Sequence, residues 1–196
     1  GFSVMGGEAI FADTSLTIES IPGAAHRQIW MNCREGDFTD KNLRQAVAYG
    51  LDRQALVDTL LNGRGKVAND HPIATVYPYY DAEAVPQRER DIEKAMGLLE
   101  AAGKAGYTTT FVAPTLLEIP QLAELVQSQL KDIGMEITLN VISTDTFYDS
   151  WCKVYDSTVE PTGCDGGEDF GIVDYGNRST PDVYLVKAYA TGEWNS

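Results

Sequence analysis

The side chains best suited to metal binding or catalysis do not form a recognisable pattern in this chain. The two histidines, His26 and His71, lie far apart, and neither belongs to an HExxH arrangement that would bind zinc. Residues 165–169 are rich in carboxylates, but their spacing does not match a calcium-binding loop, so we expect a solvated loop there. The sequence has no GxSxG nucleophile motif and no Walker A loop. We therefore predict no catalytic residue, no metal site and no cofactor.

The three cysteines, Cys33, Cys152 and Cys164, are too few for a disulfide scaffold, and none belongs to a CxxC pair. Cys152 and Cys164 are near enough in sequence to close a short loop in an oxidising compartment. We nevertheless expect unpaired, mostly buried thiols.

The carboxylates decide which partners are excluded. Lys and Arg number 15 and Asp and Glu number 29, so the formal net charge is −14. A chain this acidic repels phosphate backbones and anionic membrane surfaces, which argues against nucleic acid as a partner. A pair of carboxylates would suit a hydrolase, but nothing in the sequence selects one pair. A carboxylate-based hydrolase and a protein interaction module remain as alternative functions.

Strand and helix patterns alternate along the 196 residues, which are enough to bury a core. Strands are predicted at residues 27–32, 107–112 and 136–142 from apolar, β-branched and alternating patterns. Helices are predicted at residues 41–61, 92–102 and 120–133, with a short one after Asp145. This order indicates an α/β or α+β fold in which helices pack on a sheet.

Capping residues and apolar stripes define these helices. Asp40 and Asp91 are suitable N-caps, and Pro120 suits the first turn of the third helix. Helix ends are expected at Asn62-Gly63, Gly103 and Gly134. The inward-facing positions are expected to be Leu43, Ala46, Val47, Gly50, Val57 and Leu61 in the first helix, Ile92, Ala95, Met96, Leu99 and Ala102 in the second, Leu122, Val126, Leu130 and Ile133 in the third, and Ile137, Leu139 and Val141 in the strand after it.

An ordered set of short motifs resembles one protein family, the extracytoplasmic solute-binding proteins of peptide and nickel ABC importers (family 5). The motifs are Met31-Asn32, Phe38-Thr-Asp40, LRQAVAYGLDR at 43–53, Gly63, IEKAMGLLEAAG at 92–103, LAELVQSQLKDIG at 122–134, and Asp174-Tyr175 with PDVYL at 181–185. Each motif alone is modest, whereas their order is specific. Arg44 and the Asp52-Arg53 pair are expected to form ion pairs that hold the first helix against the sheet.

The resemblance implies a fold and a role. The chain would be the second lobe of a type II periplasmic-binding protein, an α/β unit with a mixed β-sheet flanked by helices. Residues 1–25 would approach from lobe one, and residues 26–196 would form the second lobe. The expected function is non-catalytic capture of a solute, expected to be a small peptide, and delivery to an ABC permease in the membrane. We expect an extracytoplasmic monomer, either periplasmic or a lipid-anchored lipoprotein.

The resemblance also implies where ligand contacts lie, namely in loops at strand ends within residues 171–181. Asp174 is the expected acceptor for the α-amino group of a peptide. Asn177 is the alternative residue for that role. Asp174 would otherwise be a solvated carboxylate in a turn, with no contact to ligand. Tyr175 and Arg178 are expected to stack on or pair with the ligand.

Other positions bear on which solute would be bound. Dipeptide-binding relatives carry an arginine near the place of Ala113, and its absence here argues against dipeptide specificity. Trp151, Trp194 and the tyrosines Tyr77, Tyr79 and Tyr80 would line an apolar pocket or pack in the core.

Overall fold

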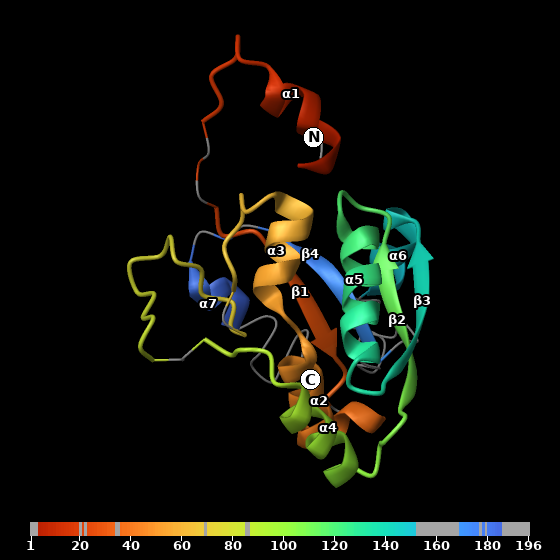
Figure 1. Ribbon diagram of the computed structural model, residues 1–196. Helices are drawn as coiled ribbons and strands as arrows, with labels where there is room; N and C mark the ends of the chain where they lie inside the picture. Colours follow the sequence, from red (N-terminus) through yellow and green to blue (C-terminus); the bar gives the residue numbers. More distant parts are fainter. Residues whose placement is uncertain are drawn as a thin grey trace, which may run out of the picture.

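The computed structural model describes residues 4–19, 21, 23–33, 36–68, 70–84, 87–151, 169–176, 178 and 180–185. Within these residues four strands form one sheet in the order β1-β4-β2-β3 (Figure 1). The strands are β1 (His26–Met31), β2 (Thr108–Pro114), β3 (Glu136–Ile142) and β4 (Phe170–Tyr175). Strand β2 runs parallel to β3 and β4, and β1 runs antiparallel to β4. This confirms the predicted α/β class with a mixed sheet.

The strand directions bring residues distant in sequence to one edge of the sheet. His26, the first residue of β1, pairs with Tyr175, the last residue of β4. Pro114 and Ile142, the last residues of β2 and β3, pair with each other. We call this the carboxyl edge, because the three parallel strands end there. Open α/β sheets bind ligands at such edges.

Helices cover both faces of the sheet (Figure 1). The α-helices are α1 (Glu8–Ala12), α2 (Lys41–Gly50), α3 (Arg53–Leu61), α4 (Ile92–Ala101), α5 (Ile119–Lys131), α6 (Thr144–Trp151) and α7 (Pro181–Tyr184), with 3₁₀ turns at Met5–Gly7 and Asp37–Thr39. Helix α5 packs on the face that carries Phe170 and Ile172, and α6 packs through Phe147 on the face that carries Val173. Helices α2 and α4 pack together beside the sheet. In the described part of the chain, no helix has both the length and the apolarity needed to span a bilayer.

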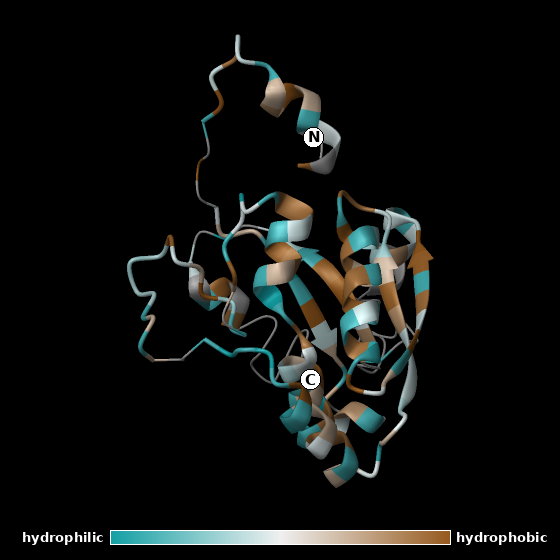
Figure 2. Ribbon diagram, in the orientation of Figure 1, coloured by the Kyte–Doolittle hydropathy of each residue, from teal (hydrophilic) through white to brown (hydrophobic). Residues whose placement is uncertain are grey.

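The core consists of two groups of buried side chains. The larger group joins α2, α4 and α5 to the sheet, and its centre is aromatic: the ring of Phe170 lies 4.5 Å from that of Phe111 and 5.0 Å from that of Phe38. The smaller group, Val112, Phe147, Val173 and Tyr175, lies on the α6 face. Figure 2 shows hydrophobic residues concentrated on the strands and on α5.

Residues 41–61 form two helices rather than the single helix predicted. The backbone is extended at Leu51 and Asp52, and the Asp52 carboxylate accepts a hydrogen bond from the amide of Ala55 at 2.9 Å, which starts α3. The side-chain amide of Gln129 in α5 bonds the Asp52 backbone on both sides, accepting from its N–H at 2.8 Å and donating to its C=O at 3.3 Å. The apolar stripe was compatible with one helix, but these hydrogen bonds favour a break.

Most predicted helix starts and ends are confirmed. The carboxylates of Asp40 and Asp91 accept from the amides of Asn42 and Lys94 at 2.7 and 2.9 Å. The glycines 63, 103 and 134 have positive φ, which favours glycine.

Some side chains expected in the core lie in solvent, because the neighbouring elements leave them uncovered. Ile92 and Met96 of α4 are 37% and 45% exposed, since α2 covers the face of Ala95 and Leu99 instead. Val141 of β3 is 42% exposed, because β3 is the outer strand of the described sheet.

The predicted ion pairs of the first helix are only partly right. Arg53 pairs with Asp70 at 2.6 Å. Arg44 donates instead to the carbonyls of Phe38 and Thr39, at 2.7 and 2.9 Å, and Asp52 serves as a helix cap. Arg44 therefore joins the 3₁₀ turn at Asp37–Thr39 to α2.

Candidate functional site

Three charged side chains meet at the carboxyl edge. Arg27 lies in β1 directly opposite Asp174 in β4, and its Nη1 donates to Asp174 Oδ1. Its Nε and Nη2 both contact Glu118 Oε1, at 2.8 and 2.7 Å. Glu118 directly precedes α5, so this cluster joins two strands to the start of a helix. We call Arg27, Asp174 and Glu118 the edge cluster.

The members of the edge cluster differ in exposure. The side chain of Glu118 is 7% exposed, whereas those of Arg27 and Asp174 are 24% and 26% exposed. The buried carboxylate of Glu118 is satisfied by the two contacts from Arg27, as a buried charge must be. Asp174 keeps contact with solvent and is therefore the carboxylate that a ligand can reach.

The turn before Glu118 is strained. Leu117 has a φ of +50°, in the left-handed region that leucine rarely adopts, and its side chain is 45% exposed. Such strain persists only where the surrounding structure enforces it, and it is concentrated at functional sites. Here it places an apolar side chain in solvent beside the edge cluster.

Aromatic residues flank Asp174 on the α6 face. The Tyr148 hydroxyl donates to the backbone carbonyl of Asp174 at 3.4 Å, and the ring of Phe147 packs edge-on against that of Tyr148 at 5.2 Å. Burial raises the pKa of Tyr148, the Asp174 charge raises it further, and Arg27 opposes both. Tyr148 is 44% exposed, so it offers both a ring and a hydroxyl at this edge.

The structure places three predicted ligand residues, Asp174, Tyr175 and Arg178, close together at the end of β4. Asp174 and Tyr175 end a strand rather than lying in the loop expected for them, because residues 170–175 pair with β1. Tyr175 is 8% exposed and its ring stacks on His26 at 5.5 Å, an environment suited to packing. The Arg178 guanidinium lies 5.4 Å from the centre of the Tyr175 ring, and the Arg178 carbonyl accepts a hydrogen bond from the Tyr77 hydroxyl. Asp174, Tyr175 and Arg178 are thus neighbours, and their roles toward a ligand stay predictions.

Several predictions fall elsewhere. Asn177, Cys152, Cys164, Trp194 and residues 165–168 lie outside the described residues, as does the side chain of Trp151. Tyr77 and Tyr79 stack at 5.5 Å near Arg178, while Tyr80 lies beside His71 at 5.8 Å, so the tyrosines divide between two places. Ala113 is fully buried in β2.

Sequence reasoning missed Arg27, Glu118 and Tyr148. Positions 27, 118 and 174 are too far apart for any spacing rule to link them. An arginine in an apolar strand and a glutamate just before a proline-initiated helix were the only signals available.

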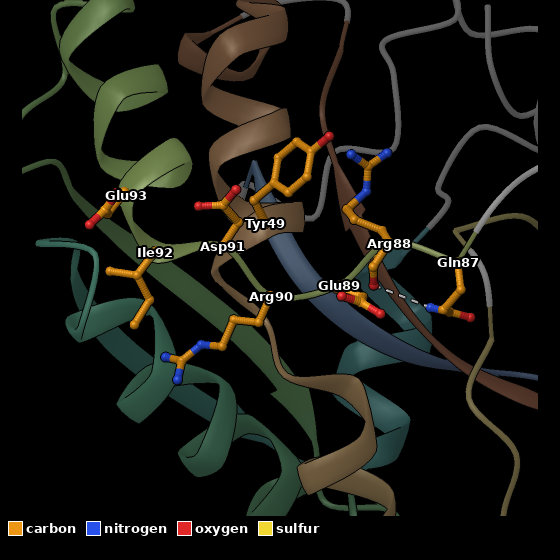
Figure 3. A pocket seen from close by; sticks show the side chains of 8 residues that line it. All are labelled: Tyr49, Gln87, Arg88, Glu89, Arg90, Asp91, Ile92 and Glu93. Carbon is orange, nitrogen blue, oxygen red and sulfur yellow. Dashed lines mark hydrogen bonds between the residues drawn. The ribbon is translucent and has the colours of Figure 1, made fainter.

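A second surface feature lies at the opposite end of α5. Tyr49 and residues 87–93 line an open hollow (Figure 3). Arg88 stacks over the Tyr49 ring at 4.5 Å, and Arg90 binds Asp132 at 2.7 Å and the carbonyl of Gly50 at 2.9 Å. Gln129 and Asp132 belong to the end of α5, roughly 20 Å from Glu118 at 1.5 Å rise per residue. These cations are occupied in holding elements together, so we place the candidate site at the carboxyl edge.

The edge cluster supplies charge and hydrogen bonds rather than metal ligands. Over the ranges that the structure describes, no three His, Cys, Asp or Glu side chains are grouped closely enough to hold a metal ion. Asp174 can accept a hydrogen bond from a cationic group, and Tyr148 can stack on a flat or apolar one.

Comparison with known proteins gives a consistent result. The family model described as "Bacterial extracellular solute-binding proteins, family 5 Middle" matches residues 5–195. The oligopeptide-binding protein AppA of Bacillus subtilis is 33% identical over 123 residues, which cover 54% of this chain and 22% of that protein. The chain therefore spans about a quarter of the length of the curated relatives it matches.

Solved structures share the fold. A putative peptide-binding protein AppA from Clostridium difficile superposes with a TM-score of 0.81 at 20% identity, covering 99% of this chain and 38% of that one. NikA from Staphylococcus aureus, solved in complex with Ni(L-His)2, superposes with a TM-score of 0.77 at 20% identity, covering 97% of this chain and 39% of that one. The fold class predicted from the resemblance is confirmed.

Proposed function

Because the chain belongs to family 5 of the bacterial extracellular solute-binding proteins, we propose that it forms one wall of a cleft that closes over a solute. This family consists of extracytoplasmic, non-enzymatic binding proteins that serve transport. Family membership overturns the alternative of a carboxylate-based hydrolase.

The observation that carries the proposal is the position of Asp174. Its half-exposed carboxylate lies at the carboxyl edge, where open α/β sheets bind ligands, beside the strained turn at Leu117. We propose that Asp174 accepts the α-amino group of a peptide, while Tyr148 holds the Asp174 backbone from the α6 side through its hydroxyl. A charge-assisted hydrogen bond of this kind is short and directional. The B. subtilis relative is described as an oligopeptide-binding protein, which supports a peptide as the solute.

The roles of the other predicted residues follow from their packing. The buried ring of Tyr175 stacks on His26 and lies close to the Arg178 guanidinium, so we propose that it supports the end of β4 that carries Asp174. Arg178 is half-buried over that ring, so we propose that it bounds the site. Asn177, outside the described residues, stays the alternative acceptor for the α-amino group.

The wider role is also a proposal. Residues 26–196 would form the second lobe, and residues 1–25 would lead to it from the first. The complete protein, a monomer that is periplasmic or lipid-anchored, would deliver its solute to an ABC permease. Figure 1 shows α1 beyond the end of α3, where the Arg64 guanidinium lies 4.1 Å from the centre of the Phe11 ring.

The test is isothermal titration of the complete protein that contains this chain. The ligands are one peptide with a free amino end, its N-acetylated form, and nickel with histidine. We expect Asp174→Asn to weaken binding of the free-amine peptide by about 1.5–3 kcal/mol, the contribution of a hydrogen bond to a charged group, with little effect on the acetylated peptide.

Asp132→Asn is the matched control, because Asp132 is also paired with an arginine but lies at the other end of α5. It should leave both affinities unchanged. Equal loss for both peptides in Asp174→Asn, or binding of the nickel complex alone, would contradict the proposal.

A further inference from the structure

Arg27 is anchored on the buried side of the edge cluster and reaches toward the exposed side. Two of its nitrogens, Nε and Nη2, contact Glu118 Oε1 at 2.8 and 2.7 Å, and Glu118 is nearly inaccessible to solvent. Its third nitrogen, Nη1, contacts Asp174. The planar guanidinium therefore fixes the Asp174 carboxylate of β4 relative to Glu118 at the start of α5.

Asp174 is held by one oxygen only. Arg27 contacts Oδ1, and no described residue makes a hydrogen bond or ion pair with Oδ2. The backbone of Asp174 is fixed by pairing with β1 and by the hydrogen bond from Tyr148. The contact with Arg27 thus fixes the rotation of the carboxylate and leaves its second oxygen for another donor.

We propose that Arg27 is a positioning residue of the ligand site, which orients Asp174 so that Oδ2 receives the ammonium group of the solute. This inference rests on the proposed function, in which Asp174 binds that ammonium. Two carboxylates and one arginine leave a single negative charge at the edge, which matches one ammonium group.

Removing Arg27 separates positioning from simple charge attraction. If Arg27 only neutralised Asp174, its loss would free negative charge and strengthen binding of an ammonium ligand. If Arg27 positions Asp174, its loss lets the carboxylate rotate away from the productive geometry, and binding weakens. The two effects have opposite signs.

The experiment measures how strongly the complete protein prefers a free-amine peptide to its N-acetylated form. In Arg27→Met we expect this preference to fall about tenfold, the factor that one well-aligned charged hydrogen bond contributes. Arg27→Lys keeps the charge but lacks the planar fork, so we expect a partial loss, and it serves if the methionine variant fails to fold. A purely structural arginine would weaken both peptides equally and leave the preference unchanged.

Arg90→Met is the matched control, because the Arg90 side chain is 24% exposed, as is that of Arg27, and it also joins separate elements. It should lower thermal stability without changing the preference. An unchanged or increased preference in both Arg27 variants overturns the inference. The inference is also overturned if the Arg27 variants bind peptides with a free carboxyl end more weakly but bind the corresponding peptide amides normally. Arg27 would then bind the ligand carboxylate itself. In either case, if Asp174→Asn still abolishes the preference for the free-amine peptide, the proposed function of Asp174 survives. If Asp174→Asn leaves that preference intact, the proposed function and the inference about Arg27 both fail.

Discussion

Gly171 in β4 is the position where a single added methyl group should have the clearest effect on stability. It lies opposite Trp30 of β1 and Val112 of β2 in the sheet. A Cβ at this position would lie 2.5 Å from Val112 Cγ1 and 2.8 Å from Trp30 Cζ2, whereas ordinary contact begins at 3.4 Å. The two neighbours belong to the strands on either side of β4, so movement away from one approaches the other.

We expect Gly171→Ala to lower the free energy of unfolding by about 1–3 kcal/mol, the usual cost of overpacking a core. Val112 is short and stiff at χ1, so relief requires the indole of Trp30 or the strands themselves to shift. The damage would fall on the group of Val112, Phe147, Val173 and Tyr175 beneath the candidate site.

Gly97→Ala is the matched comparison, because Gly97 lies within α4 and a Cβ there would meet nothing within 4 Å. We expect it to raise the free energy of unfolding by about 0.5–1 kcal/mol, since alanine favours a helix interior. Urea titration followed by circular dichroism measures both variants. Equal or greater stability in Gly171→Ala would refute the overpacking argument.

Three further changes test other parts of the structure. Asp52→Ala removes the N-cap of α3 and should lower the free energy of unfolding, measured by urea denaturation, by about 0.5–2 kcal/mol. An unchanged free energy of unfolding would mean that the start of α3 does not depend on this carboxylate. Leu130 of α5 is fully buried, so Leu130→Ala opens a cavity and should lower the free energy of unfolding by about 2–5 kcal/mol in the same assay. A smaller loss would show that the neighbouring side chains fill the cavity or that Leu130 is not packed as described. The hydrogen bond from Lys104, at 2.6 Å, lowers the pKa of Asp37 below its ordinary 3.8, so its contribution to stability is complete above about pH 4 and is lost as pH falls through the folded-state pKa. Lys104→Met should return the Asp37 pKa toward 3.8 in an NMR titration, and an unchanged value would rule out Lys104 as the cause.

Local chemistry explains why much of the fold was predictable. The caps Asp40 and Asp91 each accept a hydrogen bond from an amide two or three residues later, so the information lies within one turn of the chain. The helix ends at Gly63 and Gly103 are equally local, because they depend on the positive φ of a single glycine. The face of α5 was also correctly predicted, since Leu122, Val126 and Leu130 are all buried.

The failures involve contacts between distant segments. Residues 41–61 have one continuous apolar stripe, but Gln129, 77 positions after Asp52, binds the Asp52 backbone at the break. Strand β4 was not predicted; among the described residues it pairs with β1 and β2, which both lie far from it in the sequence. The edge cluster joins residues 91 and 147 positions apart, and only the sheet register shows that Arg27 faces Asp174.

The break between α2 and α3 has a consequence for how the protein opens. The Asp52 amide lies outside any helix or strand, and such amides usually exchange with solvent through small local fluctuations. Here its proton is held by the side chain of Gln129, from a helix that is packed against the sheet. Because the same side chain also donates to the Asp52 carbonyl, we expect release to accompany separation of α3 from α5. Hydrogen exchange at this one irregular position should report the undocking of a whole helix, and its protection should fall when the packing of α5 is weakened.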